Sequence, residues 1–311
     1  MSRWLVSAPV DLGLMMGPAL LALAVVLGLP DGVDVSPAGW LLLVVAVDVA
    51  HVYASLYRTY LHPTERSRRA RLLVGAPLVA LLLAAGLCLG SQALFWRVLA
   101  YVAVWHFIKQ QVGFAALYRL RAGLPTRSRA ARLERAAIWA LTLGPVVWWH
   151  ANLPRRFEWF VEGDFVAGLP PIAGTAAGWL GAAVVAAHLL VRLRSGHRVG
   201  GGDLWLATTG AVWVGGIVLT DGDLAFTATN VLLHGLPYLV LVAWVGSRER
   251  APSAHAGAGP PATAQPRLAA VLAFALPLIV LALAEEAAWD ALVWHDHEAF
   301  FGAWSPPSWA A

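Results

Sequence analysis

The sequence predicts an all-α integral membrane protein, a single polytopic bundle of about nine transmembrane helices with its N-terminus in the cytoplasm. Its composition differs from that of a soluble domain, because 59% of the 311 residues are hydrophobic and only 13% are charged, against about 25% in typical soluble proteins. Apolar windows of transmembrane length recur along the chain. Arginines gather in every second connection between these windows, as expected where loops alternate between the two sides of a membrane.

Nine apolar windows have the length needed to cross a bilayer. They lie at residues 9–29, 37–62, 72–91, 94–118, 134–153, 170–191, 203–220, 223–246 and 267–288. We expect residues 1–288 to form one transmembrane domain. The first window lacks a clear signal-peptide cleavage site, so we interpret it as a retained helix.

Two segments of the expected bundle are not apolar windows. Residues 251–266 are rich in proline, alanine and glycine, which indicates a flexible cytoplasmic linker. Residues 289–311 contain four tryptophans, and such a segment is expected to lie along the outer membrane interface.

The positive charge predicts the orientation of the chain. Arg3 and the arginines of residues 66–71, 119–135, 192–198 and 248–267 fall in alternate connections, which the positive-inside rule places in the cytoplasm. Because the net charge of +4 comes from these short loops, we expect the bilayer, and not nucleic acid, to be the partner. The single cysteine excludes an intrachain disulfide and a Cys-x-x-Cys motif.

One polar stripe interrupts the second apolar window. Its members recur every three or four residues, which places them on one helical face: Asp48, His51, Ser55, Arg58, His62 and Glu65. An ionisable group at membrane depth costs a few kcal/mol, so we expect this stripe to face protein, a cavity or a bound ion.

Three histidines are expected to meet near the membrane midplane. His51, His106 and His234 lie about 14, 12 and 11 residues into three windows that all run from outside to inside, so their depths agree within roughly 5 Å. A single membrane histidine is more often a hydrogen-bond partner between helices. Three at one depth favour a shared site, and imidazoles with open coordination positions suit iron, copper or zinc.

Three further side chains are candidates for direct roles at this site. Asp48 lies one turn from His51 and is either a further ligand or the acceptor that orients its ring. Tyr238, one turn after His234, is a candidate fourth ligand or proton donor. Lys109 is the only lysine in the chain and lies deep in its window, so we expect a carboxylate partner such as Asp48.

Four more residues are candidates for supporting roles. Gln110 and Asn230 each lie one turn from a histidine, where they are placed to hydrogen-bond the ligands. Arg58 and His62 end the polar stripe at the cytoplasmic side, where we expect interfacial contacts with head groups or local ion pairs.

Three short patches, AHVYASLY, WHFIKQQ and LLHGLPY, resemble the bacterial membrane-embedded β-carotene dioxygenases, the bacteriorhodopsin-related-protein family. The resemblance implies a helical protein of the bacterial cytoplasmic membrane that holds iron through His51, His106 and His234 and cleaves a carotenoid with O₂. The sequence departs from the family at two places. Tyr238 stands where the family has a second late histidine, and Ala50 and Val52 replace the proline and glycine around the early one.

The residues leave three functions open. The first is a non-haem Fe(II) oxygenase, or a related oxidoreductase, acting on a lipid-soluble and carotenoid-like substrate. The second is a proton-coupled transporter that uses Asp48, His51, Arg58 and His62 as a relay. The third is a b-type haem or quinone protein with two histidines as axial ligands. The zincin motif HExxH, the histidine clusters of membrane desaturases and phosphate-binding glycine loops are absent from the sequence.

Overall fold

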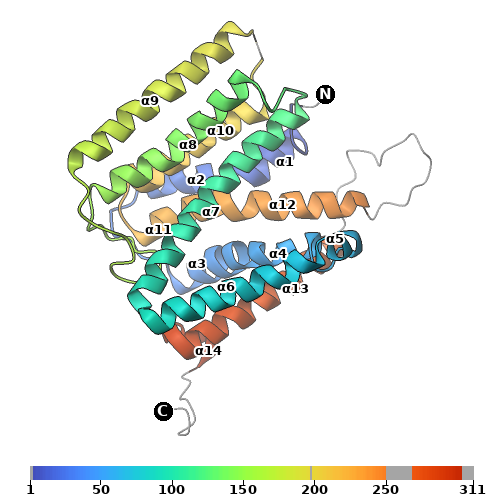
Figure 1. Ribbon diagram of the computed structural model, residues 1–311, viewed down its shortest axis with the longest axis vertical. Coiled ribbons are helices and arrows are strands. Elements are labelled where there is room, and N and C mark those ends of the chain that lie inside the picture. Colours follow the sequence, from blue (N-terminus) through green and yellow to red (C-terminus); the bar gives the residue numbers. More distant parts are fainter. Residues whose placement is uncertain (1–2, 197, 250–267, 303–311) are drawn as a thin grey trace.

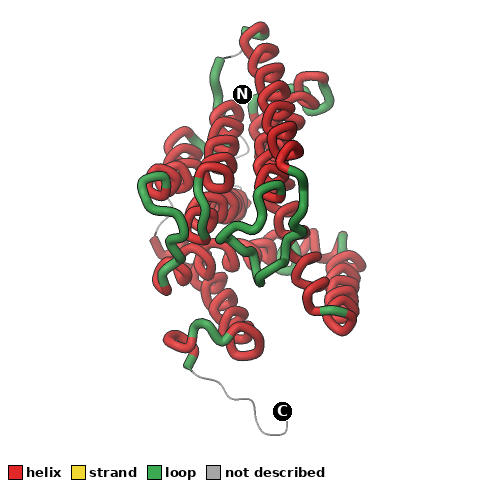
Figure 2. Tube along the Cα trace, turned by 90° about the vertical axis from the view of Figure 1, so that its left-hand side faces the viewer, coloured by secondary structure: helices red, strands yellow, loops and turns green. Residues whose placement is uncertain are grey.

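The computed structural model describes residues 3–196, 198–249 and 268–302, and this part of the chain consists of helices and loops without a strand (Figures 1 and 2). The first half contains α1 (Ala8–Val10), η1 (Asp11–Met16), α2 (Gly17–Val26), α3 (Pro37–Trp40), η2 (Leu41–Val49), α4 (Ala50–Arg58), α5 (Pro63–Arg68), α6 (Ala70–Gly90) and α7 (Gln92–Arg121). The second half contains α8 (Arg129–His150), α9 (Pro171–Arg194), α10 (Gly201–Val214), η3 (Gly215–Leu219), α11 (Asp223–Phe226), η4 (Thr227–Val231), α12 (Leu232–Glu249), α13 (Leu268–Trp289), η5 (Asp290–Trp294) and α14 (Glu298–Phe301). The η segments are π-helical turns.

Seven helical units of the described chain are long and apolar enough to cross a membrane. A helical membrane protein is therefore supported. The two remaining long helices, α7 and α8, occupy predicted windows but are more polar, since α7 carries Arg97, Lys109 and two adjacent glutamines. The predicted count of nine spans thus stays a prediction, and so does the location of the N-terminus.

The helices divide into a central group with many buried side chains and peripheral helices whose side chains are mostly exposed. The main core cluster joins side chains of the first helical unit, α7, α8, α10 and α12, and its largest fully buried members include Trp205, Trp213 and Tyr118. By contrast, α6 has no buried residue and its apolar side chains are exposed. An exposed apolar surface of this extent is typical of a helix that contacts lipid or another protein.

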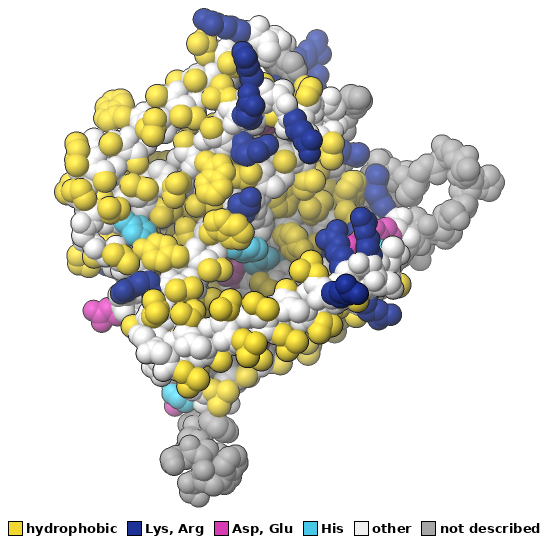
Figure 3. Space-filling model, viewed as in Figure 1, with side chains coloured by type: hydrophobic (Ala, Val, Ile, Leu, Met, Phe, Trp, Pro, Cys, Tyr) yellow, Lys and Arg dark blue, Asp and Glu magenta, His cyan; other side chains and the backbone are white. Residues whose placement is uncertain are grey.

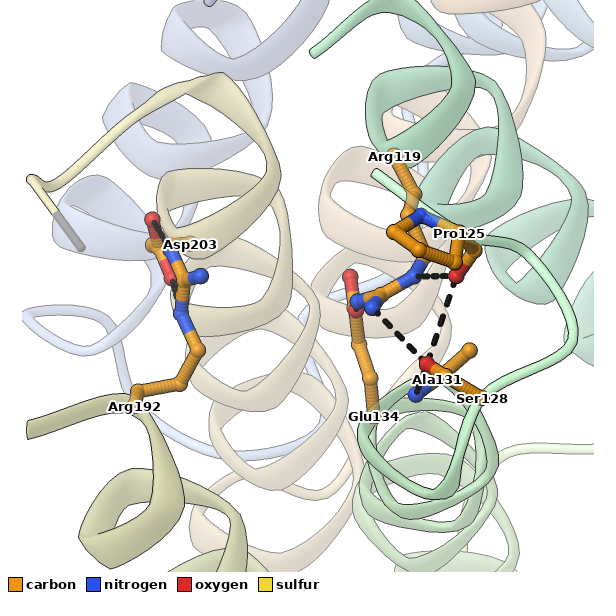
Figure 4. A network of polar contacts seen from close by, with 7 residues as sticks. All are labelled: Arg119, Pro125, Ser128, Ala131, Glu134, Arg192 and Asp203. Atoms are coloured by element: carbon orange, nitrogen blue, oxygen red, sulfur yellow. Dashed lines mark hydrogen bonds and ion pairs between the residues drawn. The ribbon is translucent and has the colours of Figure 1, made fainter. Parts of the chain in front are cut away.

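Ion pairs tie the arginine-rich ends of the central helices together (Figure 4). The buried Arg119 guanidinium pairs with Glu134 of α8, and its Nε donates to the Pro125 carbonyl at 2.7 Å. Arg192 of α9 makes a two-pronged contact with the Asp203 carboxylate, at 2.7 and 2.6 Å. Two parallel bonds of this kind fix the relative position of the helices as well as neutralising charge.

The polar stripe of the second window does not continue along one helix. The helix ends at Arg58, and a new helix starts at Pro63, whose N-cap is the His62 side chain accepting from the Glu65 amide at 3.3 Å. Proline lacks an amide hydrogen and disfavours helical geometry in the residue before it. The expectation of a single stripe reaching Glu65 was therefore wrong beyond Arg58.

Most of the arginine side chains collect along one side of the molecule. They lie along the upper and right-hand rim in Figure 3, toward which α7, α9 and α12 run. The expected linker at 251–266 and the tail beyond residue 302 lie outside the described residues. The described start of the tail folds back on the bundle, where His297 stacks on Trp40 at 3.7 Å between ring centroids.

Candidate metal centre

His51, His106 and His234 lie together in the centre of the molecule. One nitrogen of each ring is within 4.8 Å of the corresponding nitrogens of the other two. The ring centroids of His51 and His234 are 4.5 Å apart, those of His106 and His234 are 4.9 Å apart, and those of His51 and His106 are 6.3 Å apart. The structure thus brings together three residues that are distant in the sequence, as their equal depth predicted.

A close approach of two helices places His234 beside His51. A Cβ atom at Gly235 would lie 2.6 Å from a side-chain carbon of Val47 and 2.9 Å from the Val47 carbonyl oxygen, so only glycine fits at this crossing. The neighbouring residues then project their rings into the same space. Wide π-helical turns precede both histidines, at Leu41–Val49 and Thr227–Val231, and such turns are frequent at functional sites.

Helix α7 supplies the third histidine and holds His234 from a second side. Phe107 stacks on the His234 ring with 3.7 Å between centroids and 7° between planes. The Gln110 side-chain amide donates to the His234 backbone carbonyl. Gln110 therefore contacts His234 through the backbone of α12 and not through an imidazole, and its supporting role stays a prediction. Sequence reasoning missed Phe107, although it directly follows His106.

The imidazoles of His51 and His234 have no hydrogen-bond partner in the described part of the chain. Their side chains are buried, with 4% and 0% of their surface exposed. All four ring nitrogens are buried and unpaired. Leaving a buried polar group unpaired costs about 1–3 kcal/mol, and a metal ion is one ligand that removes this cost for several imidazoles together.

The spacing of the donors suits one metal ion after a small contraction. Atoms at the corners of a triangle with 4.8 Å edges lie about 2.8 Å from its centre, whereas metal–imidazole bonds are about 2.0–2.1 Å long. Small rotations of the three side chains close this difference. Three neutral imidazoles from three helices are a donor set for iron, copper or zinc with further positions open.

Asp48 lies where its carboxylate can orient His51. Its Oδ1 atom is 3.6 Å from His51 Nδ1, slightly beyond hydrogen-bond length, and has no other partner among the described residues. Sequence reasoning missed Glu286 of α13, which is an electrostatic neighbour of Asp48. An adjacent Glu285 accepts from the Tyr53 hydroxyl at 2.9 Å. The pair of glutamates in an apolar helix was the signal available in the sequence.

The other candidates for direct roles lie at different distances from the three rings. Tyr238 borders the site, with its ring centroid 6.0 Å from that of His51. Lys109 does not reach Asp48, and no carboxylate of the described residues pairs with it. Its ammonium lies 5.8 Å from the centre of the exposed Trp105 ring. The expected Lys109–Asp48 pair was therefore wrong, because Lys109 projects from the outward face of α7.

Three of the four supporting candidates have their partners away from the three histidines. The Arg58 guanidinium pairs with Glu249 at 2.7 Å and His62 approaches the same carboxylate at 3.7 Å, so both act at the helix ends, as the interfacial interpretation expected. Asn230 lies one turn before His234, but its amide donates to Thr229 at 3.1 Å and no contact with a histidine is recorded. Its Oδ1 atom is buried without a partner.

The site opens sideways past α7. His106 is exposed while His51 and His234 are buried, and the neighbouring Trp105 is 56% exposed. Figure 3 shows histidine and acidic side chains in a hollow near the centre of the molecule, between hydrophobic side chains. The exposed side of the site is thus bordered by hydrophobic side chains.

Comparison of this chain with protein-family models, with curated proteins and with solved structures finds no match. The arguments about function therefore rest on the geometry of the site.

Proposed function

We propose that this protein is a metal-dependent membrane oxidoreductase that holds non-haem iron through His51, His106 and His234 and acts on a lipid-soluble substrate. The observation that carries the proposal is the set of four buried, unpaired imidazole nitrogens on His51 and His234, facing a third imidazole at the lipid-side opening. A metal ion binds one nitrogen of each ring, so a single ion would remove the cost of burial for one nitrogen of His51 and one of His234 while it also binds His106.

The chain's own residues have definable tasks around that ion. A hydrogen bond from His51 Nδ1 to Asp48 would fix the tautomer that leaves Nε2 free as a ligand. Phe107 and Gln110 hold His234 in place. Bound iron(II) would supply the one-electron chemistry that reactions with O₂ require. The opening at His106 admits an apolar substrate from the bilayer while the apolar helices exclude water.

The two alternative functions receive less support from the geometry. A proton relay from Asp48 to the cytoplasm would pass Arg58 and His62, but both are engaged with Glu249 at the end of a broken helix. Two axial ligands must have a porphyrin plane between them. The space beside His234 is instead filled by His51 at 4.5 Å and Phe107 at 3.7 Å between centroids.

A narrower proposal concerns the substrate and the setting. The three sequence patches that resemble the membrane-embedded β-carotene dioxygenases favour a polyene or another carotenoid-like substrate in a bacterial cytoplasmic membrane. Tyr238 stands at the place of that family's additional histidine and borders His51. We therefore propose a centre of three histidines, with the Tyr238 phenol beside it.

Metal analysis with an absorption spectrum tests the proposal directly. Protein purified in detergent after growth with iron should contain about one iron per chain and show no Soret band. His106→Ala should remove the metal, whereas the matched variant His62→Ala, which changes an interfacial histidine, should retain it. Metal content that is unchanged in His106→Ala would reject the assignment, and a Soret band would favour the haem alternative.

A further inference from the structure

A separate pocket lies between the C-terminal halves of α7 and α12, on the arginine-rich side of the histidine cluster. Its volume is about 500 Å³, within the usual range for sites that bind small molecules. Leu117 of α7 and Leu241 of α12 are among its apolar walls, and Trp244 lies nearer its arginine-bearing end. The end of α4 and the N-terminal Leu5 close it.

One end of this pocket carries positive charge. Arg58 and Arg121 both line it. The Arg121 guanidinium lies 5.5 Å from the centre of the Trp244 ring, and its Nε donates to the Leu5 carbonyl at 3.1 Å. No carboxylate of the described residues pairs with Arg121. Arg58 does have one, Glu249 at 2.7 Å, so Arg121 is the cation with spare capacity for an anion.

The other end of the pocket adjoins the candidate metal centre. Tyr238 lines the pocket, and its ring centroid is 6.0 Å from that of His51. Its hydroxyl forms no hydrogen bond with any described residue. The pocket and the histidine cluster thus share one wall, and a ligand that fills the pocket has one end at Arg121 and the other beside Tyr238.

We propose that this pocket binds a single-chain amphiphilic acid, with its carboxylate at Arg121 and its hydrocarbon chain along Leu117 and Leu241. The chain then ends at Tyr238, beside the three histidines. Two features support this ligand class. Most of the lining residues are apolar, and the only full charges among them are Arg58 and Arg121, the last residues of α4 and α7. A single acyl chain suits a pocket of about 500 Å³ better than the two chains of a phospholipid do.

The inference rests on the proposed function only for the statement that this acid is a substrate. It would narrow the substrate class from any lipid-soluble molecule to an amphiphile whose carboxylate lies at the arginine-bearing helix ends. The end of the chain remote from the carboxylate would then be the part presented to the metal centre. Binding itself requires no metal, so it can be measured independently.

The test uses cis-parinaric acid, a fluorescent fatty acid, and its methyl ester with the purified full-length protein in phosphatidylcholine nanodiscs. The acid should bind saturably to one site. Arg121→Gln should weaken its binding by roughly 10- to 100-fold, the expected effect of losing a charge-assisted hydrogen bond. The methyl ester should bind more weakly than the acid and should not respond to this substitution. The matched control Arg135→Gln changes an exposed arginine on α8 and should have no effect.

A second variant tests the pocket without changing its charge. Leu241→Trp fills the apolar branch and should abolish binding of both the acid and the ester, while thermal unfolding shows that the protein remains folded. Equal affinities for acid and ester, or an affinity unchanged by Arg121→Gln, would overturn the inference. Competition by phosphatidylglycerol in the nanodisc would also overturn it, because the pocket would then be a site for bilayer lipid.

Metal content separates this inference from the proposed function. His51→Ala should lose iron and still bind cis-parinaric acid, and Arg121→Gln should keep iron and lose the acid. Iron-free wild-type protein that binds the acid would reject the metal centre and leave the pocket standing. Iron-loaded protein that does not discriminate acid from ester would reject the pocket and leave the metal centre standing.

Discussion

Two regions of this molecule bury histidines in opposite ways. At the C-terminal end of α8, His150 is 7% exposed, and both of its ring nitrogens are paired. Its Nδ1 lies 2.7 Å from the Val146 carbonyl, and its Nε2 lies 2.8 Å from the Tyr101 hydroxyl. In the centre of the bundle, His51 and His234 are equally buried and all four of their nitrogens are unpaired.

The difference shows that burial alone does not mark a metal ligand. His150 has the role that is commonest for a membrane histidine, a hydrogen-bond link between helices: Tyr101 of α7 meets α8 through it. The same Tyr101 hydroxyl accepts from the Val166 amide at 3.1 Å, and this bond holds the loop between α8 and α9 against α7. His51 and His234 have no such task within the fold, so the structure leaves their nitrogens available for an external ligand.

The largest effect that separates the two regions is on metal content. His234→Ala removes one of three ligands, and we expect loss of essentially all bound iron, more than the roughly 10- to 100-fold loss typical of changes to groups around a ligand. His150→Ala should retain the metal. Elemental analysis of both proteins after the same purification checks this. Equal iron in the two variants would contradict the contrast between the regions.

The second prediction concerns stability without metal, where we expect substitution of His150 to have a larger effect than substitution of His234. In protein treated with a chelator, His150→Phe should lower the free energy of unfolding by about 1–3 kcal/mol, because the Tyr101 hydroxyl and the Val146 carbonyl lose their partner. His234→Phe should be neutral or stabilising, since it replaces an unpaired buried imidazole by an apolar ring. Denaturant titration of both variants provides the measurement. A larger loss of unfolding free energy for His234→Phe than for His150→Phe would contradict the absence of hydrogen bonds to the His234 ring.

The third prediction concerns linkage between metal binding and stability. At an iron concentration of about 100 times the dissociation constant, the metal should stabilise the wild-type protein by about 2.7 kcal/mol. Thermal unfolding with and without chelator should reveal this difference in the wild type and in His150→Ala. It should be absent in His234→Ala. A chelator effect that persists in His234→Ala would place the metal elsewhere.

Sequence reasoning placed His51, His106 and His234 together because helical rise converts residue number into depth with little error. It could not foresee which side chains meet across helix crossings. The stacking of Phe107 on His234, the closeness of Glu286 to Asp48 and the pocket beside Tyr238 all depend on crossing angles, which no local pattern specifies. The expected Lys109–Asp48 pair was wrong for the same reason.

Some of these features were nevertheless indicated by the sequence. Pro63 follows His62 and stops the second helical unit, so the polar stripe could have been ended there. Gly235 beside His234 marks the close crossing with Val47. The count of spans stayed open because α7 and α8 carry more charged and polar residues than the other long helices, which lowers the mean hydropathy on which the prediction of spans depends.

The fourth prediction tests whether Asp48 orients His51, and its expected effect on iron binding is smaller than that of removing a ligand. Asp48→Asn keeps the shape but weakens the acceptor beside His51, so iron affinity should fall by about 10- to 100-fold. Glu286→Gln, which changes the neighbouring carboxyl without touching a histidine, should alter affinity less. Competition with a graded series of chelators measures both. An Asp48→Asn protein with wild-type affinity would show that the carboxyl at 3.6 Å does not orient the ring.

The smallest expected effect is on the pH dependence of the unfolding free energy, through Asp164 in the loop between α8 and α9. Burial raises the pKa of Asp164 above its ordinary value, and the amides of Trp159 and Phe160, which donate to its carboxylate, offset this only in part. An acid with a raised pKa in the folded state stabilises the fold most at pH below its unfolded pKa of about 3.9. That contribution is lost as the pH rises through the folded pKa. Asp164→Asn cannot titrate, so the difference in unfolding free energy between variant and wild type should change with pH over this range and level off above it.

The His234→Phe protein should show the same pH dependence as the wild type there, since the loop is independent of the histidine cluster. A flat difference for Asp164→Asn would mean that the amides and burial cancel, so that the pKa of Asp164 is the same in the folded and unfolded states. A difference that changes with pH in the opposite direction would mean that the amides dominate over burial.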